Sequence, residues 1–246
     1  MRLGMMQPYF FPYLGYFGLI HAADHWMVFD TPQYIRRGWI NRNRVLSAGQ
    51  SAWRYIRVPV AQCDRSTPIY KVCVHPTAMW REELLNSLTV YRLKNAPYYL
   101  ETIEFLTETL SCNTKSLTDL IVHCLCCCCE YLGLPFRFET FSKADLVLPD
   151  IGTPGQWALE TARALGATSY VNPPGGRRIF DSEAFKQARI DLKLLRPALP
   201  AYDQKTSRFE CGLSIIDALM WNKTATVRDM IADYELIAAD SHQFAA

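Results

Sequence analysis

The residues best suited to chemistry in this 246-residue chain are four arginines within nine positions: Arg36, Arg37, Arg42 and Arg44. A guanidinium group binds phosphate or carboxylate through paired hydrogen bonds, so such a cluster is typical of an anion site. Trp39 and Asn41 lie between the arginines and would add a stacking surface and amide hydrogen bonds. We therefore predict a site for the diphosphate of a nucleotide or nucleotide sugar. The structural alternative is a solvated hairpin face with surface ion pairs.

Three further residues are candidates for proton transfer. Asp30 ends an apolar run just before the arginines, and His21 titrates in the range that suits a general base, although a structural histidine fits equally well. Asp217 follows Ser214 at an expected helix start, where a cap and the helix dipole offer a structural explanation. His21, Asp24 and His25 have helical spacing, but the helix is expected to end near Asp24 and no further ligand is identifiable. We predict no metal site.

Uncharged candidates for substrate binding follow the ends of expected strands. Tyr9, Tyr13 and Trp39 would stack on a base or sugar. The remaining candidates are Gln7, Gln33, Tyr34, Tyr170 and Asn172. Gly175-Gly176, followed by Arg177 and Arg178, could approach an anion through backbone amides, but a loop of two glycines is a weak signal.

Two short strands would position the first of these groups. Leu3 to Met6 ends at Gln7-Pro8, because proline lacks the amide hydrogen that a sheet needs. Apolar spacing predicts a helix over Gly15 to Ala23, and Trp26 to Phe29 is the second strand. The carboxyl ends of parallel strands meet at one edge of a sheet, where ligands bind. We therefore expect Gln7, Asp30 and Tyr170 around one pocket.

The rest of the chain alternates between helices and strands. A hairpin joins Val45-Leu46 to Trp53 to Val60 through a turn at Ser47 to Ser51 that contains Gly49; it would hold Asn43 and Arg44 beside Arg54 and Arg57. Helices are expected over Thr77 to Lys94, Pro97 to Leu110, Leu117 to Leu132, Gly155 to Leu165, Ser182 to Ala188 and Ser214 to Trp221. Strands are expected over Phe136 to Phe141, Thr168 to Val171 and Ile190 to Leu195, the first two paired in parallel by a right-handed crossover. The sequence thus predicts one α/β domain over residues 1–246, with a mostly parallel, Rossmann-like open sheet, a β-hairpin insertion and a helical middle region.

Composition narrows the class of protein. The net charge is only +2, which argues against a general polyanion-coating role. Residues 3–20 carry no charge, but Gln7, Pro8, Pro12 and six aromatics argue against a signal or membrane-spanning helix, so we expect a soluble cytoplasmic protein. Five of the nine cysteines lie between Cys124 and Cys129. On a helix they diverge, so we expect mostly buried, unbonded thiols that bind no metal.

Several stretches together resemble the WbqC-like family over nearly the whole chain. They are residues 6–17 (MQPYFFPYLGYF), 21–24 (HAAD), 33–34 (QY), 36–44 (RRGWINRNR) and 213–217 (LSIID). Members are associated with gene clusters for O-antigen and other surface polysaccharides. Where members tend to have a second acid after Asp30, this chain has Thr31-Pro32, so a paired carboxylate is not expected there.

The resemblance implies an enzyme of O-antigen, surface-polysaccharide or related secondary metabolism. Such an enzyme would bind a nucleotide-linked sugar or similar phosphorylated substrate and transfer an acyl or aminoacyl group to an amine. The sequence does not identify a cofactor, and no membrane partner is expected. The alternatives are a non-catalytic binding or scaffold protein for a glycan precursor, a nucleotidylyltransferase-like protein, and, with less support, a tRNA-binding protein that uses the basic hairpin. The nucleotidylyltransferase comparison depends on residues 12–16 (PYLGY), where tyrosines replace the expected histidines.

Overall fold

Six strands form the main sheet in the computed structural model, which describes residues 1–49, 52–77 and 79–241. The strand order is β5-β2-β1-β6-β7-β8, and every neighbouring pair is parallel except β7 with β8 at the edge. The strands are β1 (Arg2–Met6), β2 (His25–Val28), β5 (Phe138–Thr140), β6 (Ser169–Asn172), β7 (Asp191–Pro197) and β8 (Tyr234–Ala238). The mostly parallel open α/β sheet predicted from the sequence is confirmed.

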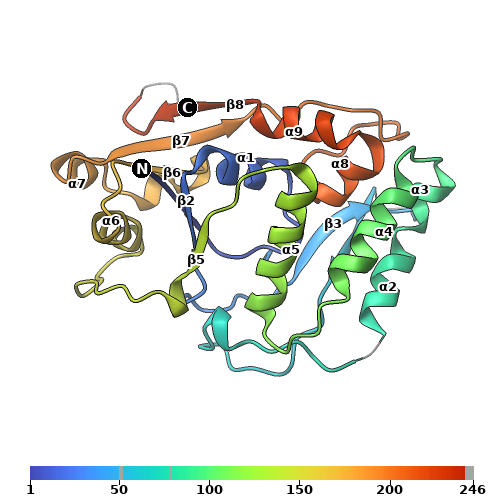
Figure 1. The fold of residues 1–246 in the computed structure, drawn as a ribbon, viewed down its shortest axis with the longest axis horizontal. Helices are drawn as coiled ribbons and strands as arrows, with labels where there is room; N and C mark the ends of the chain where they lie inside the picture. The colour runs from blue at the N-terminus through green and yellow to red at the C-terminus, as the bar shows by residue number, and fades with distance from the viewer. Residues whose placement is uncertain (50–51, 78, 242–246) are drawn as a thin grey trace.

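Side chains alternate along these strands and separate two apolar cores. Leu3 and Met5 face one side with Tyr170, where α6 (Pro154–Ala164) and α7 (Ser182–Gln187) cover the sheet. Trp26 and Val171 face the other side, beneath α1 (Leu14–Ala22) and α9 (Thr224–Ala232) (Figure 1). The connections β1-α1-β2 and β6-α7-β7 therefore cross on opposite faces and run in opposite directions from the β1/β6 boundary. That boundary is the topological switch point, where open sheets bind ligands.

The hairpin is a separate antiparallel pair, as predicted. Strand β3 (Arg42–Leu46) pairs with β4 (Trp53–Arg57), and Arg42 lies opposite Arg57. Of the predicted turn, Gln50 and Ser51 lie outside the described residues. The helical middle lies on the opposite side of the molecule from α6 and α7 (Figure 1). Its helices are α2 (Trp80–Ser87), α3 (Thr89–Leu93), α4 (Tyr99–Leu110) and α5 (Leu117–Leu132); α8 (Ile215–Trp221) packs against α4. Short 3-10 helices are η1 (Ile69–Lys71), η2 (Phe141–Lys143) and η3 (Pro174–Ile179).

Some local predictions are wrong. The single helix expected over Thr77 to Lys94 is broken at Leu88, where Ser87 Oγ donates to the Leu84 carbonyl at 2.6 Å and Thr89 Oγ1 to the Asn86 carbonyl at 2.7 Å. Such side chains compete with the helical backbone for its carbonyl groups; Ala78, near the expected start, lies outside the described residues. Strands β5 and β6 are not paired, because β2 and β1 lie between them. Helix α9 and strand β8 were not predicted.

The cysteine-rich helix α5 has the predicted bounds and caps. Ser116 Oγ accepts from the Asp119 amide, and Gly133 ends the helix at φ +65°, a conformation that favours glycine. Cys124, Cys128 and Cys129 are buried, and the other two thiols of the run are half-buried and free, so the prediction of mostly buried, unbonded thiols is confirmed. None of the helices in the described part of the chain has the length and hydropathy needed to cross a membrane.

Candidate functional site

A cavity of about 680 Å³ opens beyond the carboxyl ends of β1 and β6, at the switch point of the sheet. We call it the carboxyl-edge cavity. Its apolar wall includes Met5, Met6, Phe29, Trp157, Ile179 and Phe180. Its polar side chains include Gln7, Tyr9, Thr31, Thr153, Tyr170 and Asn172. Among the described residues that line it, there is no aspartate, glutamate, lysine, arginine or histidine. The cavity is therefore a mostly apolar space with a few neutral hydrogen-bonding groups, as is usual for small-molecule sites.

The expectation that Gln7, Asp30 and Tyr170 meet at one edge is confirmed in its geometry. Gln7 and Tyr170 line the cavity, and Asp30 lies between Phe29 and Thr31, which also line it. The Asp30 side chain itself is fully buried and does not line the cavity. The Asp30 side chain therefore stabilises the end of β2 and does not face a ligand in the cavity.

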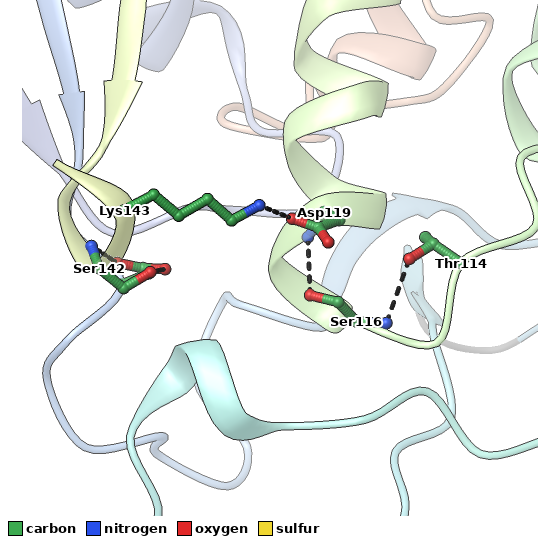
Figure 2. Close-up of polar contacts among 6 residues, drawn as sticks. Thr114, Ser116, Asp119, Ser142 and Lys143 are labelled. Carbon is green, nitrogen blue, oxygen red and sulfur yellow. Dashed lines mark hydrogen bonds and ion pairs between the residues drawn. The ribbon is translucent and has the colours of Figure 1, made fainter.

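The Asp30 carboxylate binds the start of η2. Its Oδ1 accepts from the Ser142 amide at 2.9 Å, and its Oδ2 accepts from Ser142 Oγ at 2.7 Å. Figure 2 shows that the next residue, Lys143, reaches Asp119 in the first turn of α5, at 2.7 Å. Burial raises the pKa of Asp30, while the bonds from Ser142 lower it by a smaller amount. Asp30 thus fixes the start of the segment that leads into α6 and the far wall of the cavity.

A polar group on β6 forms the floor of the cavity. Asn172 Nδ2 donates to the Tyr170 hydroxyl at 3.0 Å and to the Met5 carbonyl at 3.4 Å. Burial raises the pKa of the Tyr170 phenol, which keeps it neutral. The backbone of η3 lies against the same amide, because a Cβ at Gly176 would be 2.4 Å from Asn172 Oδ1. Gly176 therefore allows this close approach, and its amide already donates to the Pro173 carbonyl at 3.0 Å.

Most of the predicted arginines line a second hollow, of about 420 Å³, which we call the arginine groove. Its lining includes Tyr34, Arg36, Arg37, Asn41, Arg42 and Arg57, and no acidic side chain among the described residues. Arg36 donates to the Cys63 carbonyl at 2.7 Å, and Arg42 donates to the carbonyls of Gly38 and Arg37. The described part of the chain contains no ion pair that involves an arginine of this groove. Their charges are therefore uncompensated by protein acids.

The groove and the cavity are neighbours along the chain. Pro32 lines the cavity and Tyr34 lines the groove, so only Gln33 separates the two. A second connection is the hydrogen bond of 3.1 Å from the Phe10 amide to the Ile40 carbonyl. Phe10 follows Tyr9, which lines the cavity, and Ile40 precedes Asn41, which lines the groove. A ligand with a neutral part and a phosphate part could contact both.

Asp217 lies inside the protein, away from the position that its predicted catalytic role would require. Its carboxylate is fully buried and accepts three hydrogen bonds of 2.7 Å, from the Tyr91 hydroxyl, the Tyr202 hydroxyl and Gln204 Nε2. Burial raises the pKa of Asp217, and these bonds oppose the shift. The Tyr91 hydroxyl also accepts from the Leu46 amide at 3.0 Å, which ties the network to β3. Asp217 lines neither hollow.

Two other family-motif residues belong with Asp217, and we call Asn43, Ser214 and Asp217 the buried clamp. Asn43 Nδ2 and Ser214 Oγ both donate to the Phe11 carbonyl, at 2.9 and 2.7 Å. Phe11 has φ +40°, an unfavourable conformation for a side chain of this size that the two bonds help to hold. The Ser214 amide donates to the Arg44 carbonyl at 2.8 Å. The clamp joins the first motif, the hairpin and α8, so its residues position the site.

The structure does not bring His21 to this edge. His21 lies in the last turn of α1, where Arg2 at the start of β1 donates to the Ala22 carbonyl at 2.9 Å. Its Nδ1 is 3.2 Å from the hydroxyl of Tyr234, at the start of β8. This is the amino edge of the sheet, opposite the cavity, because α1 runs back along β1.

Four other candidates surround the site without lining either hollow. The Arg44 guanidinium lies over the rings of Trp39 and Trp53, at 5.6 and 5.2 Å from their centroids, and donates to the Gly212 carbonyl at 3.2 Å. Trp39 is 39% exposed, so one part of its ring remains open to solvent. Gln33 forms a bridge with Pro68, and Tyr13 lines a small recess beside Tyr202.

The far wall of the cavity has no direct signal in the sequence. Thr153 and Trp157 belong to the start of α6, and Phe180 follows η3, far along the chain from the first motif. In the sequence, Thr31 is only a departure from the family pattern. The helix after β5 and the strand end at Asn172 were predicted, however, and placing both at the carboxyl edge would have pointed to this wall.

The fold and the cavity define an open-sheet α/β protein with a ligand-sized cavity at its topological switch point. A model of the WbqC-like protein family matches residues 7–229, so the chain belongs to this family and the resemblance seen in the motifs is confirmed. The chain is 26% identical over 235 residues to a protein of Mycobacterium tuberculosis (strain ATCC 25618 / H37Rv) that is described as uncharacterized. That alignment covers 94% of this chain and 97% of the relative. No solved structure matches the chain.

Proposed function

We propose that this WbqC-like protein binds a nucleotide-linked sugar or similar phosphorylated small molecule across its two hollows. The neutral part of the ligand lies in the carboxyl-edge cavity, and its phosphates bind the guanidinium groups of the arginine groove. The observation that supports this proposal is that the two hollows are neighbours along the chain, where only Gln33 lies between Pro32 of the cavity and Tyr34 of the groove. Each hollow supplies what the other lacks: neutral contacts in one and positive charge in the other.

We further propose, from the family's association with surface-polysaccharide genes, that the bound molecule is modified by acyl or aminoacyl transfer to an amine. In that reaction the amine nitrogen forms a bond to the acyl carbonyl carbon and the bond to the acyl carrier breaks. The amine proton ends on the leaving group of the carrier. Tyr9 supplies a phenol in the cavity, and burial raises its pKa, so it serves as a hydrogen-bond donor rather than as a base.

A second candidate function is binding without catalysis, as a scaffold for a glycan precursor. It is favoured by one specific observation. Neither hollow has a carboxylate or imidazole among its described lining residues, and the two acids proposed for proton transfer are engaged in buried structural bonds. Incubation with a nucleotide-linked amino sugar and acyl donors, followed by mass spectrometry, separates the two functions. An acylated product supports the transferase, and binding without product supports the scaffold.

The binding proposal is tested by calorimetric titration with UDP-, dTDP- and GDP-linked sugars and with ATP. Arg37→Ala and Arg57→Ala each remove an exposed guanidinium of the groove, and the loss of one charge-assisted bond is expected to weaken binding by about tenfold to a hundredfold. Arg189→Ala is the matched control, because Arg189 lies beside a different hollow next to α7. Unchanged affinities in both groove variants, with the fold intact, would refute the groove as the phosphate site.

A further inference from the structure

The carboxyl-edge cavity differs from the arginine groove in having no charged side chain among its described lining residues. We infer that the group that enters this cavity is an uncharged, hydroxylated ring, such as the hexose of a nucleotide sugar, and that Thr31 is a specificity-determining side chain for it. This inference rests on the proposed function, because it names the part of the ligand that each hollow accepts. It excludes a hexuronate and a protonated amino sugar from the cavity.

Burying a charge in an apolar cavity costs free energy. A carboxylate or an ammonium group loses its water when it enters an apolar space, and this loss is large unless an opposite charge or several hydrogen bonds replace the water. The apolar wall of Phe29, Trp157 and Phe180 offers no such replacement. A neutral hydroxyl loses much less, and a single hydrogen bond compensates it. An amine would therefore enter in its neutral form, which is the form that attacks a carbonyl.

The start of α6 borders the cavity but does not supply an anion site. Gln156 Oε1 accepts from the amides of Gly152 and Thr153, at 2.7 and 2.9 Å. Pro154 has no amide hydrogen, the Gln156 amide donates to the Thr153 carbonyl at 3.1 Å, and Gly155 does not line the cavity, so this helix start offers few amides to an anion there. The Asp30 carboxylate is held by Ser142 beneath the surface and does not face a ligand. The cavity is thus neutral in its backbone as well as in its side chains.

Thr31 points to a hydroxylated ligand. Its Oγ1 is buried and has no hydrogen-bond partner among the described residues, and Thr31 lines the cavity. Buried hydroxyl groups without partners are uncommon in folded proteins, and the three others among the described residues, in Thr118, Thr161 and Ser241, do not line the cavity. A sugar hydroxyl in the cavity would supply the partner once the Thr31 side chain rotates to present its hydroxyl to the ligand. Asn172, on the opposite strand end, has its Nδ2 engaged with Tyr170 and Met5, so this amide is less available to a ligand than the Thr31 hydroxyl.

The test compares three ligands on the same nucleoside diphosphate, in whichever of the UDP, dTDP or GDP series binds: the nucleoside diphosphate alone, the neutral hexose and the corresponding hexuronate. Calorimetry is expected to show that the hexose adds affinity over the nucleoside diphosphate. The hexuronate is expected to bind at least tenfold more weakly than the hexose. Equal affinity for hexose and hexuronate, or no gain from the hexose, overturns the inference and leaves the phosphate site standing. Failure of all three ligands to bind overturns the proposed function instead.

Two variants test Thr31 directly. Thr31→Val keeps the shape and removes the hydroxyl, so hexose affinity is expected to fall about threefold to tenfold while nucleoside diphosphate affinity stays unchanged. Thr31→Lys supplies a cation and is expected to raise hexuronate affinity relative to hexose. Circular dichroism and the melting temperature check that each variant is folded like the parent. If both folded variants keep the parent's preference for hexose over hexuronate, the proposed role of Thr31 is overturned. A fall in affinity for all three ligands would mark a merely structural effect and would also overturn it.

Discussion

Replacing Asp217 by alanine is expected to destabilise the fold by about 3 to 5 kcal/mol. The change removes the acceptor for Tyr91, Tyr202 and Gln204, which all bond the carboxylate at 2.7 Å inside the protein. Each buried donor left without a partner costs roughly 1 to 3 kcal/mol, and water that enters the vacated space offsets part of that sum. The free energy of unfolding of a folded protein is only about 5 to 15 kcal/mol, so a loss of this size should be easy to measure.

Urea unfolding followed by tryptophan fluorescence would measure the effect. The Asp217→Ala midpoint should fall by roughly 1 to 2 M, whereas Asp203→Ala, which removes an exposed carboxylate paired with Lys205, should leave it almost unchanged. Tyr202→Phe removes one bond and should cost about 1 kcal/mol. If Asp217→Ala does not fold, Asp217→Asn keeps one acceptor oxygen and should give an intermediate loss. A double variant of Asp217→Asn and Tyr202→Phe that is strictly additive, or an Asp217→Ala midpoint equal to the parent's, would refute the shared network.

Two further predictions concern the edge of the sheet. Burial raises the pKa of Asp30 above its ordinary value of 3.8, so the folded protein keeps this proton at pH values where the unfolded chain has lost it. The stability gained from this proton is complete below about pH 3.8 and is lost as the pH rises through the higher pKa of the folded state. The stability of the parent relative to Asp30→Asn should therefore decline with rising pH in that window. A relative stability that increases with pH would contradict the assignment. Gly155→Ala would place a methyl group 2.1 Å from the Ile179 carbonyl oxygen, where α6 meets η3 at the cavity wall. It should cost about 1 to 3 kcal/mol of stability and weaken ligand binding, measured by thermal melting and calorimetry, while Gly175→Ala, which meets no atom within 4 Å, should behave like the parent.

The carboxyl edge of the sheet could be predicted because its signals are local. Leu3 to Met6 ends at a proline, and Asp30 and Asn172 follow short apolar runs, so strand ends could be placed to within one or two residues. The parallel arrangement then brings those ends together by rule. Arg42 and Arg57 could be placed by similar local signals, because a hairpin with a clear turn sets their strand positions, whereas Arg36 and Arg37 lie in the loop before β3.

The remaining part of the site depends on contacts between distant segments. Tyr91 lies 126 residues from Asp217, and no spacing rule links the two. No spacing rule links η3 to the start of α6 either. Their contact depends on Gly155 and on the 3-10 turn of η3, and the only sign of this turn in the sequence is a pair of glycines. Arg44 was placed among the anion-binding residues by proximity in sequence. Alternation along β3 puts it on the same face as Arg42, but the rings of Trp39 and Trp53 occupy its guanidinium.

The buried clamp also constrains the order in which the protein can fold. Asn43 and the Phe11 carbonyl are synthesised early and can form their bond early. Ser214 and Asp217 emerge only after about 170 further residues, so the bonds that join them to the first motif and, through Tyr91, to the hairpin cannot form during most of translation. Contacts of such long sequence separation are slow to form, because the intervening chain must be ordered first. A nascent chain that has not yet reached Leu213 therefore carries its arginines on a hairpin that lacks its anchor. Anion binding should be one of the last properties the molecule acquires.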